Sequence, residues 1–443
     1  MQNVVIAKPY RFVAPDRSKL WWHLFRPILS LYLRRSHGII GVECRGVERL
    51  RASLDAGHGI MLAPNHCRPP DPMILGHLSY AVGRPLYVIA SWHLFMQNAF
   101  QTFLLPRLGV FSIYREGSDR EALKTAMQLT AEADRPLVIF PEGVISRHND
   151  KLNNLMEGTA LMARGAAKQR AAANPPGKVV VHPVAIRYFF DGDVRAAVGP
   201  VLRDIERRLS WHAHEHLSVE ERIAKIGGAL LALKEIEHFG AAQTGRFQDR
   251  LDHLIDRLLV PLEAEWLKGR REKEIVQRVK LLRIAMVPDM AAGTLTDSEL
   301  QRRWRQLADI YLAQQLAFYP PGYLSANPTP ERLLETVERF EEDLTDVARI
   351  HTPIRAVLEV GEAIEVSPER TRSPDGDPLM TAIREHLDKC SPPLLPALPD
   401  HEHVRPPRNA HRFRRRRDCA LVLDATSRER EGSGENRRWR PFA

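Results

Sequence analysis

The chain alternates short apolar runs with longer helix-like stretches, and this alternation restricts its fold more than any other feature. Four β-prone runs occupy residues 59–64, 109–115, 137–143 and 179–186. Short buried runs separated by helical sequence are typical of a mostly parallel sheet whose faces are covered by helices. We therefore predict an α/β fold for this part of the chain.

A histidine and an aspartate follow the first apolar run, with four residues between them. His66 and Asp71 flank a loop in which Pro69 and Pro70 fix the backbone φ angles. In α/β folds, functional side chains collect at strand ends. Alone, a His near an Asp in a loop is more often an ordinary surface hydrogen bond than a catalytic pair. An imidazole oriented by a carboxylate, however, is also suited to act as a general base near neutral pH.

Further motifs end or surround the other three runs. In order and spacing they resemble the glycerolipid acyltransferase family, which includes the lysophosphatidic acid and glycerol-3-phosphate acyltransferases. The resemblance covers roughly residues 40–200. It rests on Asn-His-x4-Asp at residues 65–71, a Gly-to-Arg segment at 109–115, Phe-Pro-Glu-Gly at 140–143 followed by Ser146, and an apolar run around Pro183.

The third motif departs from the family pattern. Val144 and Ile145 stand where the family usually has Thr-Arg, and a basic residue is displaced to Arg147. That family arginine commonly helps to hold a phosphate on the acceptor, so its loss bears on a lysophosphatidate acceptor. Arg68 and Arg147 are the candidates to replace it.

The resemblance implies an O-acyltransferase of phospholipid biosynthesis. A fatty acyl group would pass from an acyl thioester, acyl-CoA or acyl carrier protein, to a hydroxyl of a glycerolipid or lysophospholipid. His66 would remove the hydroxyl proton and Asp71 would orient the ring. Glu142 and Gly143 would bind the acceptor, and Arg115 a phosphate of the acceptor or donor. A lipid hydrolase using the same pair, or a non-catalytic membrane-binding scaffold, remain as alternatives.

Neither a cysteine nucleophile nor a metal is expected. Cys67 adjoins His66, but neighbours in an extended loop point away from each other, and a thioester is already activated. The cluster His212, His214 and His216 lacks the further ligands that a metal site needs. We therefore expect no metal and no cofactor beyond the thioester co-substrate. The four cysteines lack paired spacing, which favours a reducing compartment.

Positive charge is concentrated at the two ends of the chain. The net charge is +9; residues 1–40 contribute +6 (seven Lys and Arg, one Asp) and residues 401–443 another +6 (twelve Arg, six acids), so the remainder carries 9 − 12 = −3. The tail holds an arginine-rich run at residues 412–417. Such charge favours an anionic membrane surface, and we expect no specific nucleic-acid partner.

Residues 1–40 also carry the aromatic and aliphatic residues of a membrane-interfacial helical segment. We expect peripheral attachment at the inner, cytoplasmic face of a membrane, without a signal peptide or a spanning helix, because no apolar run reaches about eighteen residues. Pro27 should divide the segment into two helical pieces. The alternative is a helix packed on the protein's own core. The residues expected to insert are Trp21, Trp22, Phe25, Leu29 and Tyr32.

The remaining sequence predicts the rest of the domain organisation. Residues 41–202 form the acyltransferase α/β domain, and residues 203–350 form a helical lobe with capping signals at Ser218, Thr296 and Thr329. Residues 351–390 should return to the catalytic domain as a strand and a helix. Residues 391–443, rich in Pro and Arg, should be disordered.

Overall fold

Eight strands form one sheet in the part of the chain that the computed structural model describes, residues 9–324, 327–369 and 376–389. The strand order is β1-β7-β6-β2-β5-β3-β4, and the short β8 pairs with β6. This mixed, mostly parallel sheet confirms the predicted α/β fold. The strands are β1 (Ile39–Arg45), β2 (Gly59–Pro64), β3 (Tyr87–Ser91), β4 (Val110–Ile113), β5 (Leu137–Val138), β6 (Val179–Phe190), β7 (Ile354–Val360) and β8 (Ile364–Glu365).

The strands that carry the sequence motifs all run in the same direction. β2 pairs in parallel with β5 and β6, and β3 pairs in parallel with β4 and β5. β7 and β8 pair antiparallel with β6, and β1, which pairs in parallel with β7, also runs opposite to β6. The carboxyl ends of β2, β4, β5 and β6 therefore meet at one edge of the sheet, where α/β folds bind ligands.

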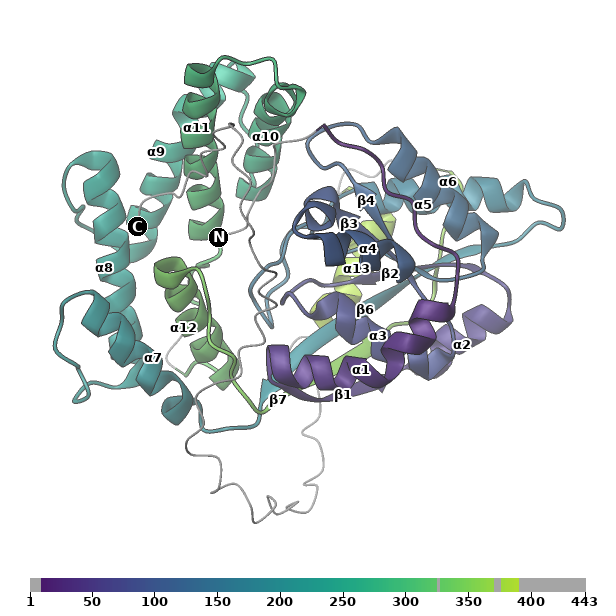
Figure 1. Cartoon of the computed structure of the whole chain (residues 1–443), viewed down its shortest axis with the longest axis horizontal. Helices are drawn as coiled ribbons and strands as arrows, with labels where there is room; N and C mark the ends of the chain where they lie inside the picture. The colour runs from purple at the N-terminus through teal and green to yellow at the C-terminus, as the bar shows by residue number, and fades with distance from the viewer. Residues whose placement is uncertain (1–8, 325–326, 370–375, 390–443) are drawn as a thin grey trace, which may run out of the picture. The chain divides into compact units, whose positions relative to one another are not determined.

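Helices cover both faces of the sheet (Figure 1). The helices α1 (Leu20–His37), α2 (Val47–Asp55) and α3 (Asp71–Val82) contribute to the hydrophobic core on one face. The core on the other face includes α5 (Arg120–Glu132), α6 (Gly158–Ala171) and α13 (Pro378–Lys389). A 3-10 turn, η1 (Trp92–Met96), and α4 (Ala99–Arg107) connect β3 to β4.

The central strand β2 is buried along its whole length, which explains its continuous apolar sequence. It begins at Gly59, where a Cβ atom would lie 2.4 Å from the carbonyl oxygen of Thr130. Only glycine permits this close approach of α5 to the strand. The rigid strand then ends directly before the loop that carries His66.

Six helices lie between β6 and β7 in the described ranges of the chain. Of these, α9, α10 and α11 pack together around a hydrophobic core of their own (Figure 1), whereas α7 and α12 share the core of the sheet. The capping box predicted at Ser218 and Glu221 is confirmed, as are side-chain caps at Thr296 and Thr329. After these helices the chain returns to the sheet as β7 and β8. Their bounds are α7 (Val194–Arg208), α8 (Val219–Phe239), α9 (Phe247–Leu267), α10 (Ile275–Ala292), α11 (Asp297–Leu316) and α12 (Pro330–Thr345).

The N-terminal helix corrects one sequence prediction. α1 continues through Pro27 as a single helix, so the expected division into two pieces is wrong. Pro27 lies on the exposed side, where water can hydrogen-bond to the carbonyl group left without its helical donor. No helix among the described residues is long and apolar enough to span a membrane. The predicted tail at residues 391–443 lies outside the described residues.

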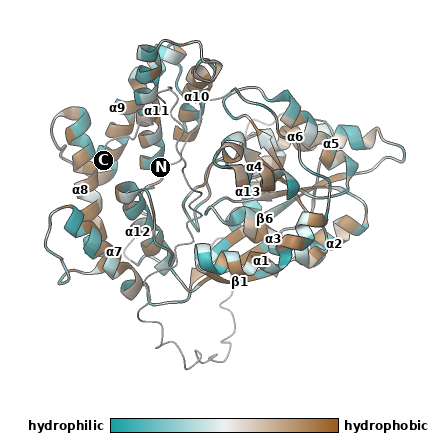
Figure 2. Ribbon diagram, viewed as in Figure 1, coloured by the Kyte–Doolittle hydropathy of each residue, from teal (hydrophilic) through white to brown (hydrophobic). Residues whose placement is uncertain are grey.

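The two sides of α1 differ in their environment. Figure 2 shows hydrophobic residues interspersed with hydrophilic ones along this helix. Leu29 and Leu33 are buried in the core, and the Trp22 indole donates a 2.7 Å hydrogen bond to the hydroxyl of Ser79. Leu29 is therefore not available for insertion into a membrane. The exposed apolar residues of α1 are Leu20, Leu24, Ile28, Leu31 and Tyr32.

Candidate active site

His66 lies directly beyond the carboxyl end of β2, with its ring oriented by Asp71. The Nδ1 atom of His66 is 2.8 Å from Oδ2 of Asp71, the first residue of α3. The histidine side chain is 15% exposed and the aspartate is fully buried. Because Nδ1 faces the carboxylate, the second ring nitrogen, Nε2, remains available to a substrate. This is the arrangement that a histidine general base requires.

Several donors hydrogen-bond to the Asp71 carboxylate at once. Its Oδ2 atom also accepts a 2.9 Å hydrogen bond from the backbone N–H of Arg68, and its Oδ1 atom accepts one from the Tyr188 hydroxyl. The start of α3 adds the positive end of the helix dipole. Burial raises the pKa of Tyr188 well above its usual value, and the charge of Asp71 raises it further, so the phenol stays a donor. Sequence reasoning missed Tyr188, which lies on β6, far from the first motif in the chain.

Two further contacts fix the His66 loop. The side chain of Asn65 pairs with the backbone of Ile186 on β6, accepting from its N–H (2.6 Å) and donating to its carbonyl oxygen (3.1 Å). The ring of Phe140 stacks on the His66 ring with centroids 4.1 Å apart. Strand β6 thus fixes Asn65, the residue before the histidine, and Phe140 of the third motif packs against the His66 ring itself.

Glu142 is buried beneath the site, with only 1% of its surface exposed. Its two carboxylate oxygens accept hydrogen bonds from the backbone N–H groups of His66 (2.7 Å) and Asn153 (3.0 Å). Burial raises the pKa of Glu142 to about 7, and these two hydrogen bonds oppose that rise. The carboxylate therefore joins the loop of the first motif to the segment that follows the third.

Gly143 allows the turn after Glu142. Its φ is +69°, and a Cβ atom there would lie 2.5 Å from Cε of Met156 and 3.7 Å from Nη2 of Arg115. Arg115, beyond the end of β4, is exposed and lies against this turn. The second and third motifs therefore meet at the same edge of the sheet as His66.

Arg68 and Arg147 both form ion pairs with acidic residues of α12. Arg68 Nη2 lies 3.1 Å from Oε2 of Glu338 and 3.6 Å from Oε1 of Glu335, and Arg147 pairs with Glu342. Both guanidinium groups are therefore already paired with carboxylates. Sequence reasoning missed these pairings because about two hundred residues or more separate the partners along the chain.

Cys67 faces the protein interior. It is fully buried, and burial raises the pKa of its thiol well above the usual value. Its Sγ atom makes weak 3.8 Å contacts with Oδ1 of Asp71 and the carbonyl oxygen of Ile186. A protonated, inaccessible thiol is a poor nucleophile. No group of three or more His, Cys, Asp or Glu residues in the described ranges is arranged to hold a metal ion.

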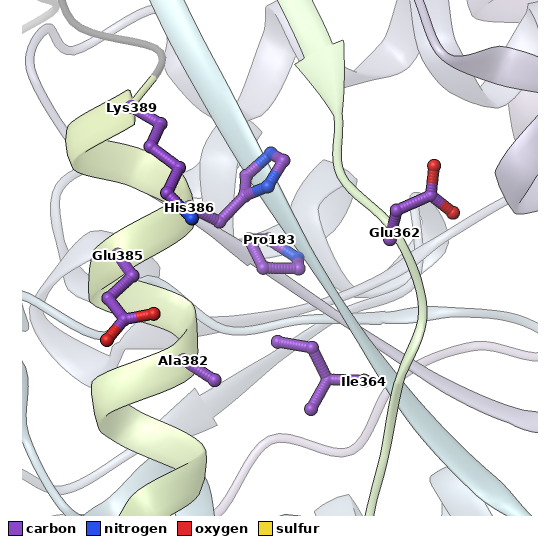
Figure 3. A pocket seen from close by; sticks show the side chains of 7 residues that line it. All are labelled: Pro183, Glu362, Ile364, Ala382, Glu385, His386 and Lys389. Atoms are coloured by element: carbon purple, nitrogen blue, oxygen red, sulfur yellow. The ribbon is translucent and has the colours of Figure 1, made fainter.

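A separate cavity of about 170 Å³ lies between α13 and the strands β6 and β8 (Figure 3). None of the sequence-predicted site residues lines it. Figure 3 shows that the side chains of α13 form one of its walls. The lining residues are Pro183, Glu362, Ile364, Ala382, Glu385, His386 and Lys389.

The comparison with protein families accounts for the part of the chain that carries this site. The model of the family described as Acyltransferase matches residues 41–187, less than half of the chain. The comparison with curated proteins gave no match. The matched segment runs from β1 into β6 and contains His66, Asp71, Arg115 and Glu142. The helices α7 to α12 between β6 and β7, called the inserted helices below, lie beyond it, as does β7. Residues 41–187 are thus an acyltransferase domain.

Proposed function

We propose that the chain transfers a fatty acyl group from an acyl thioester, acyl-CoA or acyl carrier protein, to a hydroxyl group of a glycerolipid or lysophospholipid. The observation that carries this proposal is the pairing of His66 Nδ1 with the buried Asp71, which leaves Nε2 available within an acyltransferase domain. A base in this position suits a hydroxyl acceptor, whose oxygen becomes a useful nucleophile only as its proton leaves.

The proposed reaction requires two proton transfers at one atom. Nε2 of His66 takes the hydroxyl proton while the acceptor oxygen attacks the thioester carbonyl carbon. The tetrahedral intermediate then collapses, the carbon–sulfur bond breaks, and the imidazolium returns the proton to the departing thiolate. The products are an ester and a free thiol. Asp71 stabilises the transient imidazolium, and no cofactor is needed beyond the thioester co-substrate.

We also propose that the domain works at an anionic membrane surface. The exposed apolar stripe of α1 continues onto α4, because the Trp21 ring meets the Phe103 ring edge to face with centroids 5.4 Å apart. Phe100 of α4 is 66% exposed. Aromatic and aliphatic residues beside cations are the combination that interfacial helices present to lipid headgroups. The exposed cations on or next to α1 are Lys19, Arg26, Arg34 and Arg35.

Product analysis tests the proposed activity. Purified protein would be incubated with acyl-CoA or acyl carrier protein thioester and a panel of lysophospholipids and neutral hydroxyl lipids, and products identified by mass spectrometry. We expect an acylated lipid from the wild type and none from a His66→Ala variant whose circular dichroism spectrum is unchanged. Free fatty acid released without an acceptor would indicate a hydrolase. Wild-type rates in the folded His66→Ala variant would exclude the general-base role.

A further inference from the structure

The ion pairs of α12 leave two of the expected phosphate-binding arginines without free positive charge. Arg68 is shared between Glu335 and Glu338, and Arg147 is paired with Glu342. These carboxylates neutralise much of the charge that Arg68 and Arg147 could offer to a phosphate. Cations elsewhere at the same edge of the sheet are therefore better candidates to bind the phosphate of a substrate.

Such cations are brought together by α10, a helix of the inserted segment. Nη2 of Arg283 lies 2.5 Å from Oε1 of Glu116, which directly follows Arg115 in the second motif. Glu116 is buried and also contacts Nε2 of His93 at 3.3 Å. Burial tends to raise the pKa of Glu116, but His93 and Arg283 outweigh it and lower the pKa to about 2. This ion pair joins α10 to the segment that carries Arg115.

Lys280 lies one turn before Arg283 and so faces the same side of α10. Its side chain is partly buried, and burial lowers its pKa; the positive charge of Arg115 lowers it further. Neither Lys280 nor Arg115 has an ion-pair partner among the residues that the structure describes. Arg115 itself lies against the turn at Gly143.

We propose that Lys280 and Arg283 of α10, together with Arg115, form a phosphate-binding site next to the acyltransfer site. This inference rests on the proposed function for the identity of the substrate, but the anion site itself stands on the geometry. Arg283 pairs with Glu116, Arg115 directly precedes Glu116 in the chain, and Lys280 lies one turn before Arg283, so three cations gather near one carboxylate and leave a net positive charge. Like charges held side by side repel one another, and a bound dianion removes that repulsion while accepting charge-assisted hydrogen bonds.

The ligand chemistry is a phosphate group, which both substrates can supply. The phosphates of coenzyme A would place the acyl donor, and the phosphate of a lysophospholipid would place the acceptor. Either would give the inserted helices a direct part in substrate binding, because two of the three cations belong to α10 and lie outside the matched family segment.

Calorimetric titration of the full chain with three soluble probes tests the site: coenzyme A, 3′-dephospho-coenzyme A and glycerol 3-phosphate. Lys280→Gln is the decisive variant, because it breaks no ion pair found among the described residues. Arg115→Gln provides a second test. Arg283→Gln also breaks the pair with Glu116, so Arg283→Lys, which keeps the charge, accompanies it. Lys273→Gln is the matched control, since this exposed cation lies just before α10.

We expect Lys280→Gln and Arg115→Gln each to weaken binding of one phosphate probe on the order of tenfold, with Lys273→Gln unchanged. Weaker binding of coenzyme A alone assigns the site to the donor, and weaker binding of glycerol 3-phosphate alone assigns it to the acceptor. Binding of all three probes within twofold of wild type in both variants would overturn the proposal, as would an equal loss in Lys273→Gln. These measurements need no turnover, so a failure of the proposed activity would be seen separately.

Discussion

Glu142 accepts a 2.7 Å hydrogen bond from the backbone N–H of His66, so the third motif holds the backbone of the proposed base. The other carboxylate oxygen holds Asn153 in the same way. A buried carboxylate with two backbone donors connects two loops that are far apart in the chain. This contact gives Glu142 a positioning role, separate from the acceptor binding that the family resemblance implies.

The Glu142→Gln variant separates these two roles. Glutamine has one acceptor oxygen, so its amide group must face one of the two backbone N–H donors and repel it. A positioning role predicts that kcat falls roughly ten- to a hundredfold while KM for the acceptor stays near wild type. Steady-state kinetics with Glu48→Gln, an exposed glutamate of α2, as the control would measure this. A rise in KM at unchanged kcat would instead assign Glu142 to acceptor binding.

The hydroxyl of Tyr188 should contribute to turnover through Asp71. Tyr188→Phe removes one donor from the carboxylate but leaves the contacts with His66 and Arg68 in place. We expect kcat to fall by up to about tenfold with KM unchanged. Asp71→Asn should lower kcat much further, because the ring of His66 then loses the acceptor that orients it.

A matched control for Tyr188→Phe is available on α3. Among the described residues, the Tyr80 hydroxyl donates to the backbone carbonyl oxygen of Trp22, at 3.3 Å, and not to Asp71, so Tyr80→Phe makes the same substitution away from that carboxylate. Equal kinetics in Tyr188→Phe and Tyr80→Phe would show that the hydrogen bond to Asp71 does not affect catalysis.

The sequence predicted those structural features that depend mainly on residues close together in the chain. The continuous apolar run at β2 follows from its burial on both faces, and the His66–Asp71 contact follows from a short loop with two prolines. β1 was not predicted, since Gly41, Glu43 and Arg45 interrupt its apolar character at the edge of the sheet. The Pro27 rule failed because the packing of Leu29 and Leu33 stabilises α1 as one helix.

The parts of the site that depend on distant segments had no local signal. Tyr188 reaches Asp71 only after β6 has paired beside β2. Likewise, the carboxylates of α12 reach Arg68, and α10 reaches Glu116, only once the inserted helices have packed. The family motifs identified the residues nearest the proposed chemistry, but the charge balance around them required the tertiary structure.

The stability of the protein should depend on pH through Glu335 of α12. Burial raises the pKa of this carboxyl group from 4.5 to about 7, against the opposing effects of Arg68 and Tyr323. Between these two pH values the folded chain binds more protons than the unfolded chain, so this group's contribution to stability falls as pH rises from about 4.5 to 7. The change is at most about 3 kcal/mol.

Glu335→Gln removes this titration. The difference in melting temperature between wild type and Glu335→Gln should therefore shift against wild type as the pH rises from about 5 to about 8, values on either side of this window. Differential scanning calorimetry in matched buffers would measure it. A constant difference across this range, or a difference that grows in favour of wild type, would contradict the assignment.

The exposed stripe of α1 should provide the part of membrane binding that resists salt. Leu24 and Phe100 are both exposed on the proposed surface, and inserting such side chains into lipid buries apolar area. Leu24→Ser and Phe100→Ser should each weaken liposome binding on the order of tenfold at high salt, where exposed charges are screened. Leu233→Ser, which changes an equally exposed leucine on α8 of the inserted helices, is the matched control.

Co-sedimentation with vesicles containing anionic lipid, at low and high salt, separates the apolar contribution from the cationic one. A variant with Arg34 and Arg35 changed to Gln should lose binding mainly at low salt, since each cation near an anionic surface contributes about 1 kcal/mol that salt removes. Leu24→Ser should lose binding at both salt concentrations, because apolar insertion is not screened. If Leu24→Ser and Phe100→Ser, shown to be folded, bound as well as Leu233→Ser at high salt, the surface formed by α1 and α4 would not be the one that meets the membrane.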